Sequence, residues 1–114
     1  MNMPAWLSDN SVPVVIMDDT GIIKGVNAEF EKVFAWEPAC LLGQPVSIII
    51  PPNFRDAHHM GFSRYLLSGV SSLLDTPLDL EILKGTGETV LARHLISAFQ
   101  SSDSRRFAAQ IRLR

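Results

Sequence analysis

The chain lacks several features that mark common classes of protein. It has one cysteine, Cys40, so it can form no internal disulfide and offers no cysteine pair for zinc. No apolar run approaches the roughly 20 residues that cross a bilayer. The first residues also lack the basic segment followed by a long apolar segment that marks a signal peptide. From these absences we expect a cytoplasmic protein with no membrane partner.

An excess of charge of one sign is absent too. Ten Lys and Arg residues face 12 Asp and Glu residues, which gives a net charge of −2. The basic residues near the end of the chain are too few and too strand-like for a nucleic-acid surface: they are Arg105, Arg106, Arg112 and Arg114. With 114 residues and 46% hydrophobic composition, the chain can fill one core. We expect one domain at residues 11–114 after an N-terminal cap segment at residues 1–10, and no nucleic-acid partner.

The sequence contains no recognisable catalytic motif. It has no nucleophile elbow, no glycine-rich phosphate loop and no carboxylate pair with a reason to be buried. Asp18 and Asp19 are adjacent in a turn, where paired carboxylates are more often solvated than catalytic. Cys40 has no neighbouring base that would lower the pKa of its thiol, so we expect a buried or half-buried filler. We predict that the chain is not an enzyme.

The N-terminal half predicts a hairpin followed by short helices. Residues 12–17 and 22–26 are rich in β-branched side chains, and the turn between them ends in Gly21. Asn27 is a natural cap for a helix at residues 28–35. A helical turn is expected at 39–42. The apolar run at 46–50 fits either a strand or a short buried helix, and periodicity cannot separate the two over five residues.

The C-terminal half predicts three strands. Residues 78–83 alternate strictly, with Leu78, Leu80 and Ile82 on one face and two acidic residues on the other. A glycine-rich turn at 84–88 leads to a long strand at 89–99, and a last strand follows at 106–114. Two groups of strands separated by helices predict an α+β fold, with a five-stranded antiparallel sheet and several short helices packed on one face.

Between the two halves, residues 51–69 predict one longer helix. Two prolines block a helix from upstream, Asn53 can cap the first turn and Gly69 can end it. At about 100° per residue, His58 lies in the middle of the apolar stripe of this helix. The apolar neighbours of His58 on that stripe are Phe54, Phe62 and Tyr65. A histidine on a buried helix face makes this helix the first place to look for a site.

Three segments in this order resemble the PAS domain family. Residues 18–27 are similar to the family's D-x-x-G-x-I-x-x-x-N opening, and residues 34–44 are similar to its F-G-Y-x-x-x-E-L-x-G segment. Residues 84–88 are similar to its K-D-G turn, with Gly85 and Thr86 where an acid and a glycine are more usual. The resemblance covers residues 8–112, nearly the whole chain.

The resemblance implies a sheet and helices that enclose a pocket. Such domains are sensory or interaction modules, generally fused to an output domain such as a kinase or a cyclase. We therefore expect this chain either to bind an unidentified small molecule in an apolar pocket or to mediate dimerisation. Exposed apolar residues before the first strand, such as Met3, Trp6 and Leu7, predict a homodimer. The pocket candidates are His58, Phe62, Arg64, Tyr65, Leu78 and Leu80.

The resemblance also suggests an alternative, a haem-based gas or redox sensor. The central helix is similar to the helix that carries the proximal histidine in haem-binding PAS oxygen sensors. Carried over, His58 would be the iron ligand, a metal site only if haem is bound, and Arg64 could approach a propionate. Residues 76–78 lack the arginine or methionine that those sensors place over the opposite haem face.

Other roles for the histidines also remain open. His58 could instead be a core histidine that is hydrogen-bonded through one nitrogen, or it could contact another polar ligand. His94 could lie on either face of its strand.

The resemblance bears on two further roles. Covalent flavin chemistry in this family needs a cysteine within an asparagine-cysteine-arginine helix motif, and Cys40 lies in a different segment, so we do not expect that chemistry. A pure dimerisation module is also open, in which aromatic side chains fill the pocket. The aromatic residues that could do so are Phe30, Phe34, Phe54, Phe62 and Tyr65.

Overall fold

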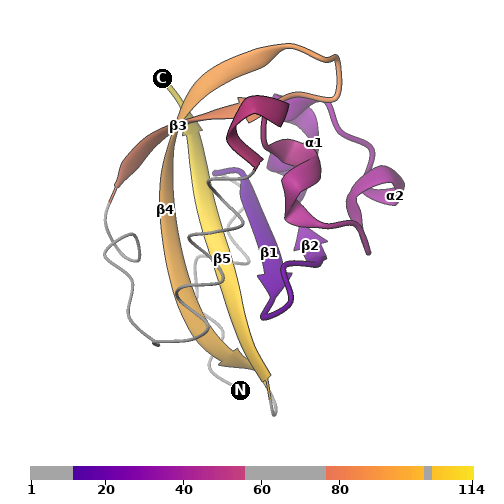
Figure 1. The fold of residues 1–114 in the computed structure, drawn as a ribbon, viewed down its shortest axis with the longest axis vertical. Coiled ribbons are helices and arrows are strands. Elements are labelled where there is room, and N and C mark those ends of the chain that lie inside the picture. Colours follow the sequence, from indigo (N-terminus) through magenta and orange to yellow (C-terminus); the bar gives the residue numbers. More distant parts are fainter. Residues whose placement is uncertain (1–11, 56–76, 102–103) are drawn as a thin grey trace.

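The computed structural model describes residues 12–55, 77–101 and 104–114. Five antiparallel strands form one sheet in the order β2-β1-β5-β4-β3 (Figure 1). The strands are β1 (Val14–Asp18), β2 (Ile23–Val26), β3 (Leu78–Leu83), β4 (Thr89–Ser101) and β5 (Ser104–Leu113). The described helices are α1 (Ala28–Phe34), α2 (Pro38–Leu41) and the 3-10 turns η2 (Val46–Ile49) and η3 (Pro52–Phe54). The predicted α+β class, with a five-stranded antiparallel sheet, is confirmed.

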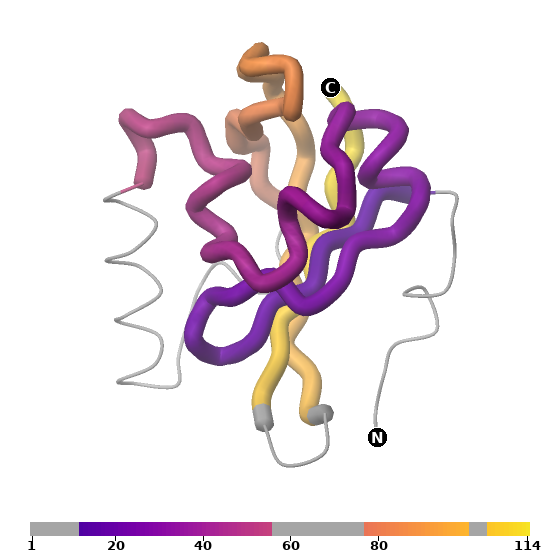
Figure 2. Tube along the Cα trace, turned by 90° about the vertical axis from the view of Figure 1, so that its right-hand side faces the viewer, coloured from indigo at the N-terminus to yellow at the C-terminus, as the bar shows by residue number. Residues whose placement is uncertain are grey.

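The two longest strands form the centre of the sheet. β4 and β5 pair from Ala92–Leu113 at one end to Ser101–Ser104 at the other. They run side by side along the length of the molecule (Figure 1, Figure 2). Because the side chains of a strand alternate between the two faces, the pairing places His94 on the same face as Ile111, and Ile96 on the same face as Ala109. This inner face packs against the helices.

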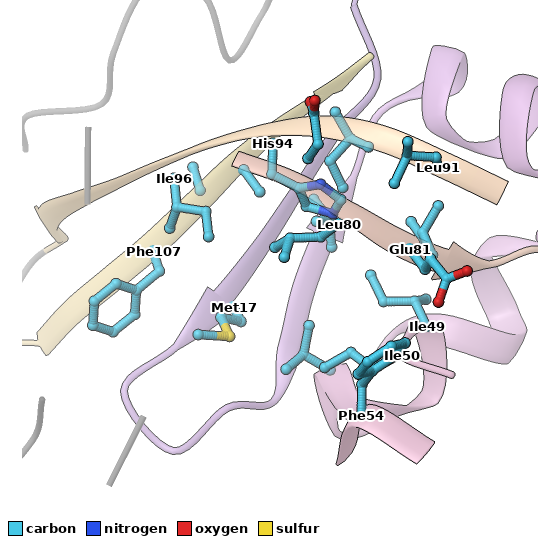
Figure 3. A pocket seen from close by; sticks show the side chains of 17 residues that line it. Met17, Ile49, Ile50, Phe54, Leu80, Glu81, Leu91, His94, Ile96 and Phe107 are labelled. Atoms are coloured by element: carbon cyan, nitrogen blue, oxygen red, sulfur yellow. The ribbon is translucent and has the colours of Figure 1, made fainter. Parts of the chain in front are cut away.

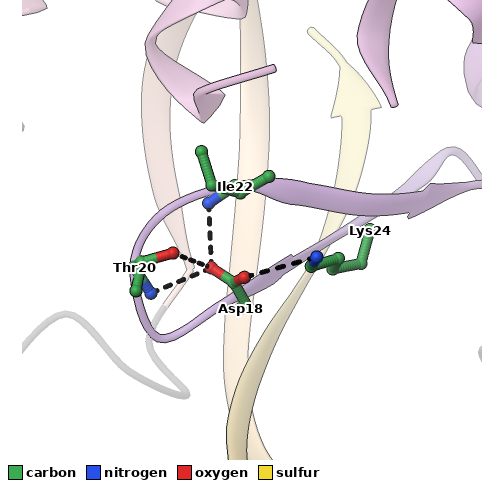
Figure 4. Close-up of polar contacts among 4 residues, drawn as sticks. All are labelled: Asp18, Thr20, Ile22 and Lys24. Atoms are coloured by element: carbon green, nitrogen blue, oxygen red, sulfur yellow. Dashed lines mark hydrogen bonds and ion pairs between the residues drawn. The ribbon is translucent and has the colours of Figure 1, made fainter. Parts of the chain in front are cut away.

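Asp18 organises the turn between β1 and β2 (Figure 4). Its Oδ1 accepts hydrogen bonds from the backbone N–H of Thr20 at 2.9 Å, the hydroxyl of Thr20 at 2.6 Å and the backbone N–H of Ile22 at 3.0 Å. Its other oxygen lies 3.7 Å from the Lys24 ammonium. Gly21 supplies the positive φ of 85° that the turn requires. The predicted hairpin is confirmed.

The Asp18 contacts predict a pH-dependent contribution to stability. Burial raises the pKa of the Asp18 carboxyl, but the hydrogen bonds from Thr20 and Ile22, with the Lys24 charge, bring the net pKa below 3.8. A carboxyl whose pKa is lower in the folded state stabilises the protein above the unfolded pKa, and this stability is lost as the pH falls through the folded pKa. Above about pH 5, we expect Asp18→Asn to lower the free energy of unfolding by about 1 kcal/mol.

Urea unfolding of the wild type and of Asp18→Asn, at pH values above and below 3.8, measures the effect. The difference between the two proteins should shrink as the pH falls below 3.8, because the wild-type carboxyl then becomes protonated. A difference that stays constant with pH would contradict the role of the Asp18 charge.

Asn27 joins helix α1 to strand β1. Its side-chain oxygen accepts from the backbone N–H of Phe30 at 3.0 Å and from that of Val14 at 2.9 Å. Its amide donates to the carbonyl of Val12 at 2.7 Å. The predicted cap is therefore confirmed, and it also fixes the helix against the sheet. Packing adds to this, because Phe30 and Phe34 are fully buried with ring centroids 5.0 Å apart.

The apolar run at 46–50 forms a 3-10 turn, so the helical alternative is the one the structure shows. Turn η2 follows Pro45, and the backbone N–H of Ile50 donates to the carbonyl of Ser47 at 3.0 Å. Its Ile49 side chain is buried. Arg55 stabilises the turn through hydrogen bonds, because its Nε–H donates to the carbonyl oxygens of both Ser47 and Ile50 at 2.9 Å.

One local prediction is wrong, and another is not tested. Asn53 lies inside η3, which Pro51 caps, and the first turn of the central helix that Asn53 was predicted to cap lies outside the described residues. Cys40 is exposed and not buried, because its neighbour Leu41 is the α2 residue that enters the core, and adjacent helix positions point about 100° apart. The rest of the predicted helix, including His58, lies outside the described residues.

The β3–β4 turn docks against the end of α1. The backbone N–H of Gly85 donates to the carbonyl of Phe34 at 2.9 Å, and the Trp36 indole donates to the carbonyl of Leu83 at 3.0 Å. A Cβ atom at position 85 would overlap the carbonyl oxygen of Ala35. This contact leaves no room for a Cβ atom at position 85.

Candidate functional site

The inner face of the sheet and the short turns line a partly open cavity (Figure 3). Its volume is about 620 Å³. This volume lies within the range of roughly 300–1,000 Å³ that is typical of small-molecule pockets. Among the described lining residues, all but Asp79, Glu81 and His94 are apolar. The apolar walls come from β1, η2, β3, β4 and β5, and include Met17, Ile49, Leu80, Ile96, Phe107 and Ile111.

The predicted pocket residues divide into two groups. Leu80 lines the cavity, whereas Leu78 is half-buried, pairs with His94 on β4 and is not among the described lining residues. The other predicted residues lie outside the described part of the chain: they are His58, Phe62, Arg64 and Tyr65. A ligand contact by any of these residues stays a prediction.

The described aromatic residues do not all serve to fill this cavity. Phe30 and Phe34 are buried in the core beneath α1 and do not themselves line the cavity. They nevertheless belong to one core cluster with the lining residues Ile49, Ile82 and Ile111. Phe54 and Phe107 line the cavity, and Phe54 keeps 44% of its surface exposed. In the part of the chain that the structure describes, the cavity therefore stays open.

His94 is a polar pocket residue that was not among the predicted candidates. It lies on the inner face of β4 in phase with Ala92 and Ile96, and only 9% of its surface is exposed. Its Nδ1 lies 3.1 Å from the carbonyl oxygen of Ala92. Strand alternation could have placed it, because Ala92, Ile96 and Ala98 form an uncharged row whereas Arg93 belongs to the other face. The imidazole projects from β4 into the cavity (Figure 3).

Burial keeps the His94 imidazole neutral. It lowers the pKa of His94 below 6.5, and the contact with the Ala92 carbonyl and the charge of Asp79 oppose this shift only in part. A buried neutral imidazole retains one nitrogen with a free lone pair, so it can accept one hydrogen bond. The cavity thus carries a single hydrogen-bonding side chain among its buried described residues.

Both acidic residues of the described lining are exposed. Asp79 pairs with the guanidinium Nε of Arg93 at 3.1 Å and that of Arg114 at 3.5 Å. The hydrogen bond from Arg93, with the charge of Arg114, lowers the pKa of the Asp79 carboxyl. Glu81 is the second acidic residue of the described lining.

The haem alternative rests on residues outside the described part of the chain, His58 and Arg64. A haem carries two anionic propionates, but the charged side chains of the described lining, Asp79 and Glu81, are both acidic. In the described ranges, no three His, Cys, Asp or Glu side chains gather to hold a metal ion. Iron ligation by His58 stays a prediction.

None of the helices that the structure describes is both long and apolar enough to pass through a membrane. A cytoplasmic location stays a prediction.

Comparison with known proteins supports the fold. A solved PAS domain from Desulfitobacterium hafniense superposes with a TM-score of 0.77 at 14% identity, covering 97% of this chain and all of that one. The PAS domain of a two-component sensor histidine kinase superposes with a TM-score of 0.73 at 13% identity, covering 96% of this chain and 91% of that one. At these identities the likeness concerns the fold alone.

Comparison of sequences identifies the family. An uncharacterized protein from Azorhizobium caulinodans is 27% identical over 109 residues, which cover 95% of this chain but only 15% of that relative. The family model of the PAS fold matches residues 2–72, more than half of the chain. The chain belongs to the PAS domain family.

Proposed function

We propose that this PAS domain is the sensory module of a larger signal-transduction protein and that it binds an uncharged small molecule in the cavity. The observation that carries the proposal is the cavity of about 620 Å³, with an almost wholly apolar described lining. Burial of apolar surface would supply most of the binding energy, at roughly 25 cal/mol per Å².

A larger parent protein fits the comparisons. This chain spans 15% of its Azorhizobium relative, and a domain of the same fold comes from a two-component sensor histidine kinase. A fused output domain, such as a kinase or a cyclase, is part of the proposal. The homodimer predicted from Met3, Trp6 and Leu7 rests on residues outside the described part. Both stay predictions.

The arrangement of the cavity suggests how binding could be transmitted. A ligand in the cavity would contact η2 on one side and the paired strands β4 and β5 on the other. If the turns and the sheet adopt two different packings, the ligand shifts the population toward the packing that it binds more tightly. The size of the shift is set by the difference in binding free energy between the two packings. The sheet would carry that change toward the ends of β4 and β5.

A variant that fills the cavity tests the proposal. We expect the wild type to bind ethylbenzene, observed as amide shift changes of cavity residues in an NMR titration. In Ile96→Trp the indole would occupy the space of the ligand, so we expect affinity to fall by roughly ten-fold or more. Leu95→Trp is the matched control, because Leu95 is the adjacent residue on the opposite face and does not line the cavity. A wild type that binds no ethylbenzene, or equal affinity in both variants, would contradict the proposal.

A further inference from the structure

The contact between His94 and its own strand fixes the proton of the imidazole. A carbonyl oxygen has no proton to donate, so the 3.1 Å contact with Ala92 requires Nδ1 to carry the hydrogen. In the neutral ring the other nitrogen, Nε2, then holds a lone pair and accepts hydrogen bonds only. The backbone thus selects one of the two neutral forms of His94.

Nε2 is the nitrogen left for the cavity. The ring projects from β4 into the cavity (Figure 3), and only 9% of the residue's surface is exposed. Among the described residues, no side chain or backbone group is recorded as a hydrogen-bond partner of Nε2. The walls around it are apolar, with Leu80 on β3, Ile96 on β4 and Ile111 on β5. An acceptor that faces such apolar walls favours a ligand that brings its own donor, because a ligand without one would cover Nε2 and leave its hydrogen bond unmade.

We propose that His94 Nε2 is the recognition point of the cavity, where it accepts a hydrogen bond from the single hydroxyl or N–H group of an otherwise apolar molecule. This inference rests on the proposed function, because it names the class of ligand for the same cavity. A phenol, an indole or an alicyclic alcohol has the required chemistry, with a body that fills apolar space and one donor that reaches Nε2. Hydrogen bonding fixes its orientation, and burial supplies the affinity.

Charge narrows the class further. Asp79 is already paired with Arg93 and Arg114, which offset its charge, and Glu81 is the other charged residue of the described lining. No lysine or arginine belongs to the described lining. A carboxylate or phosphate ligand would therefore find no cationic partner in the described walls. The ligand is uncharged.

Two probes that differ by one hydroxyl test the inference. Ethylbenzene and 4-ethylphenol have the same apolar body, and only the second can donate to Nε2. We measure the ratio of their dissociation constants in the wild type and in His94→Phe, which removes the acceptor and keeps an aromatic ring. We expect the preference for 4-ethylphenol to fall roughly ten-fold in His94→Phe, because the phenol hydroxyl is then buried without a partner.

A conservative variant separates recognition from packing. Thermal unfolding first shows whether each variant is folded. His94→Gln offers an amide oxygen as an acceptor, so we expect it to recover part of the preference that His94→Phe loses. A preference that is the same in the wild type, His94→Phe and His94→Gln would overturn the role of His94.

The wild type alone gives a second readout, which does not depend on a variant that folds. Long-range ¹H–¹⁵N NMR spectra report the two imidazole nitrogens separately, and we expect the His94 Nε2 signal to shift with 4-ethylphenol and not with ethylbenzene. If both probes bind and Nε2 responds to neither, the recognition role is wrong while the apolar cavity stands. If neither probe binds, the proposed function falls as well.

Discussion

Gly85→Ala is expected to lower the free energy of unfolding by about 3 kcal/mol, the upper end of the usual cost of overpacking. A Cβ atom at this position would overlap the carbonyl oxygen of Ala35, which is backbone and cannot rotate away. The β3–β4 turn would have to move off the end of α1. That movement would strain the hydrogen bond from Gly85 to Phe34 and the one from Trp36 to Leu83, at 2.9 and 3.0 Å.

Gly25→Ala is the matched control for this prediction. At Gly25 the added Cβ would meet the Ile16 side chain at 3.7 Å, an ordinary van der Waals distance, and the backbone needs no positive φ. Replacing a strand glycine without strain is expected to change stability by less than about 1 kcal/mol, in either direction. Urea unfolding of the two variants and the wild type measures both effects. Equal stabilities of Gly85→Ala and Gly25→Ala would show that the turn does not dock as described.

Phe34→Ala is expected to cost about 3–5 kcal/mol, which is typical of removing a fully buried phenylalanine. Phe34 has no exposed surface, and its ring lies 5.0 Å from that of Phe30, centroid to centroid. The change would leave a void at the junction of α1, η2 and the sheet, where the backbone is already fixed by the Gly85 contact. Thermal and urea unfolding measure the loss.

Phe54→Ala provides the comparison, because it removes the same side chain from the cavity wall. Phe54 is 44% exposed and belongs to the cavity lining, so its truncation should cost less than about 1 kcal/mol. The difference between the two losses in free energy of unfolding distinguishes a residue of the packed core from a residue that lines the cavity. If Phe54→Ala were as destabilising as Phe34→Ala, the cavity would be part of the closely packed core.

The strands were predictable because their patterns are local. The alternation at residues 78–83 gave β3 with its bounds, and the β-branched residues before and after Asp18 gave the first hairpin. Asn27 was also predictable, because a cap residue is recognised from its position before an amphipathic helix.

The short turns were harder to predict because their state depends on neighbours distant in sequence. The run at 46–50 has the composition of a strand, yet it forms η2 between Pro45 and the two prolines that follow, held by Arg55. Cys40 was expected inside on the strength of its apolar neighbours. One position along a helix turns a side chain by about 100°, so Leu41 occupies the core instead.

The site was predictable only in its location. The sequence placed an apolar volume between the sheet and the helices, and Leu80 does line the cavity. The sequence could not show that Phe30 and Phe34 pack beneath α1 while Phe54 lies at the cavity. In the sequence, all three phenylalanines lie on the apolar stripe of a predicted helix.

His94 was missed as a pocket residue although it alternates with Arg93, because Leu95 and Phe99 make the opposite face of the strand apolar too. The pairing with Leu78 and Ile111 assigns His94 to the inner face.

The most direct test of an open, ligand-binding cavity is a crystal structure of the protein under xenon pressure. Xenon binds open apolar cavities and not space that side chains already fill. We predict a xenon atom between Ile96 on β4, Ile49 on η2 and Ile111 on β5, and its loss in Ile96→Trp. A wild-type crystal with no xenon at this position, or with protein side chains filling it, would contradict a ligand-binding cavity in this PAS domain.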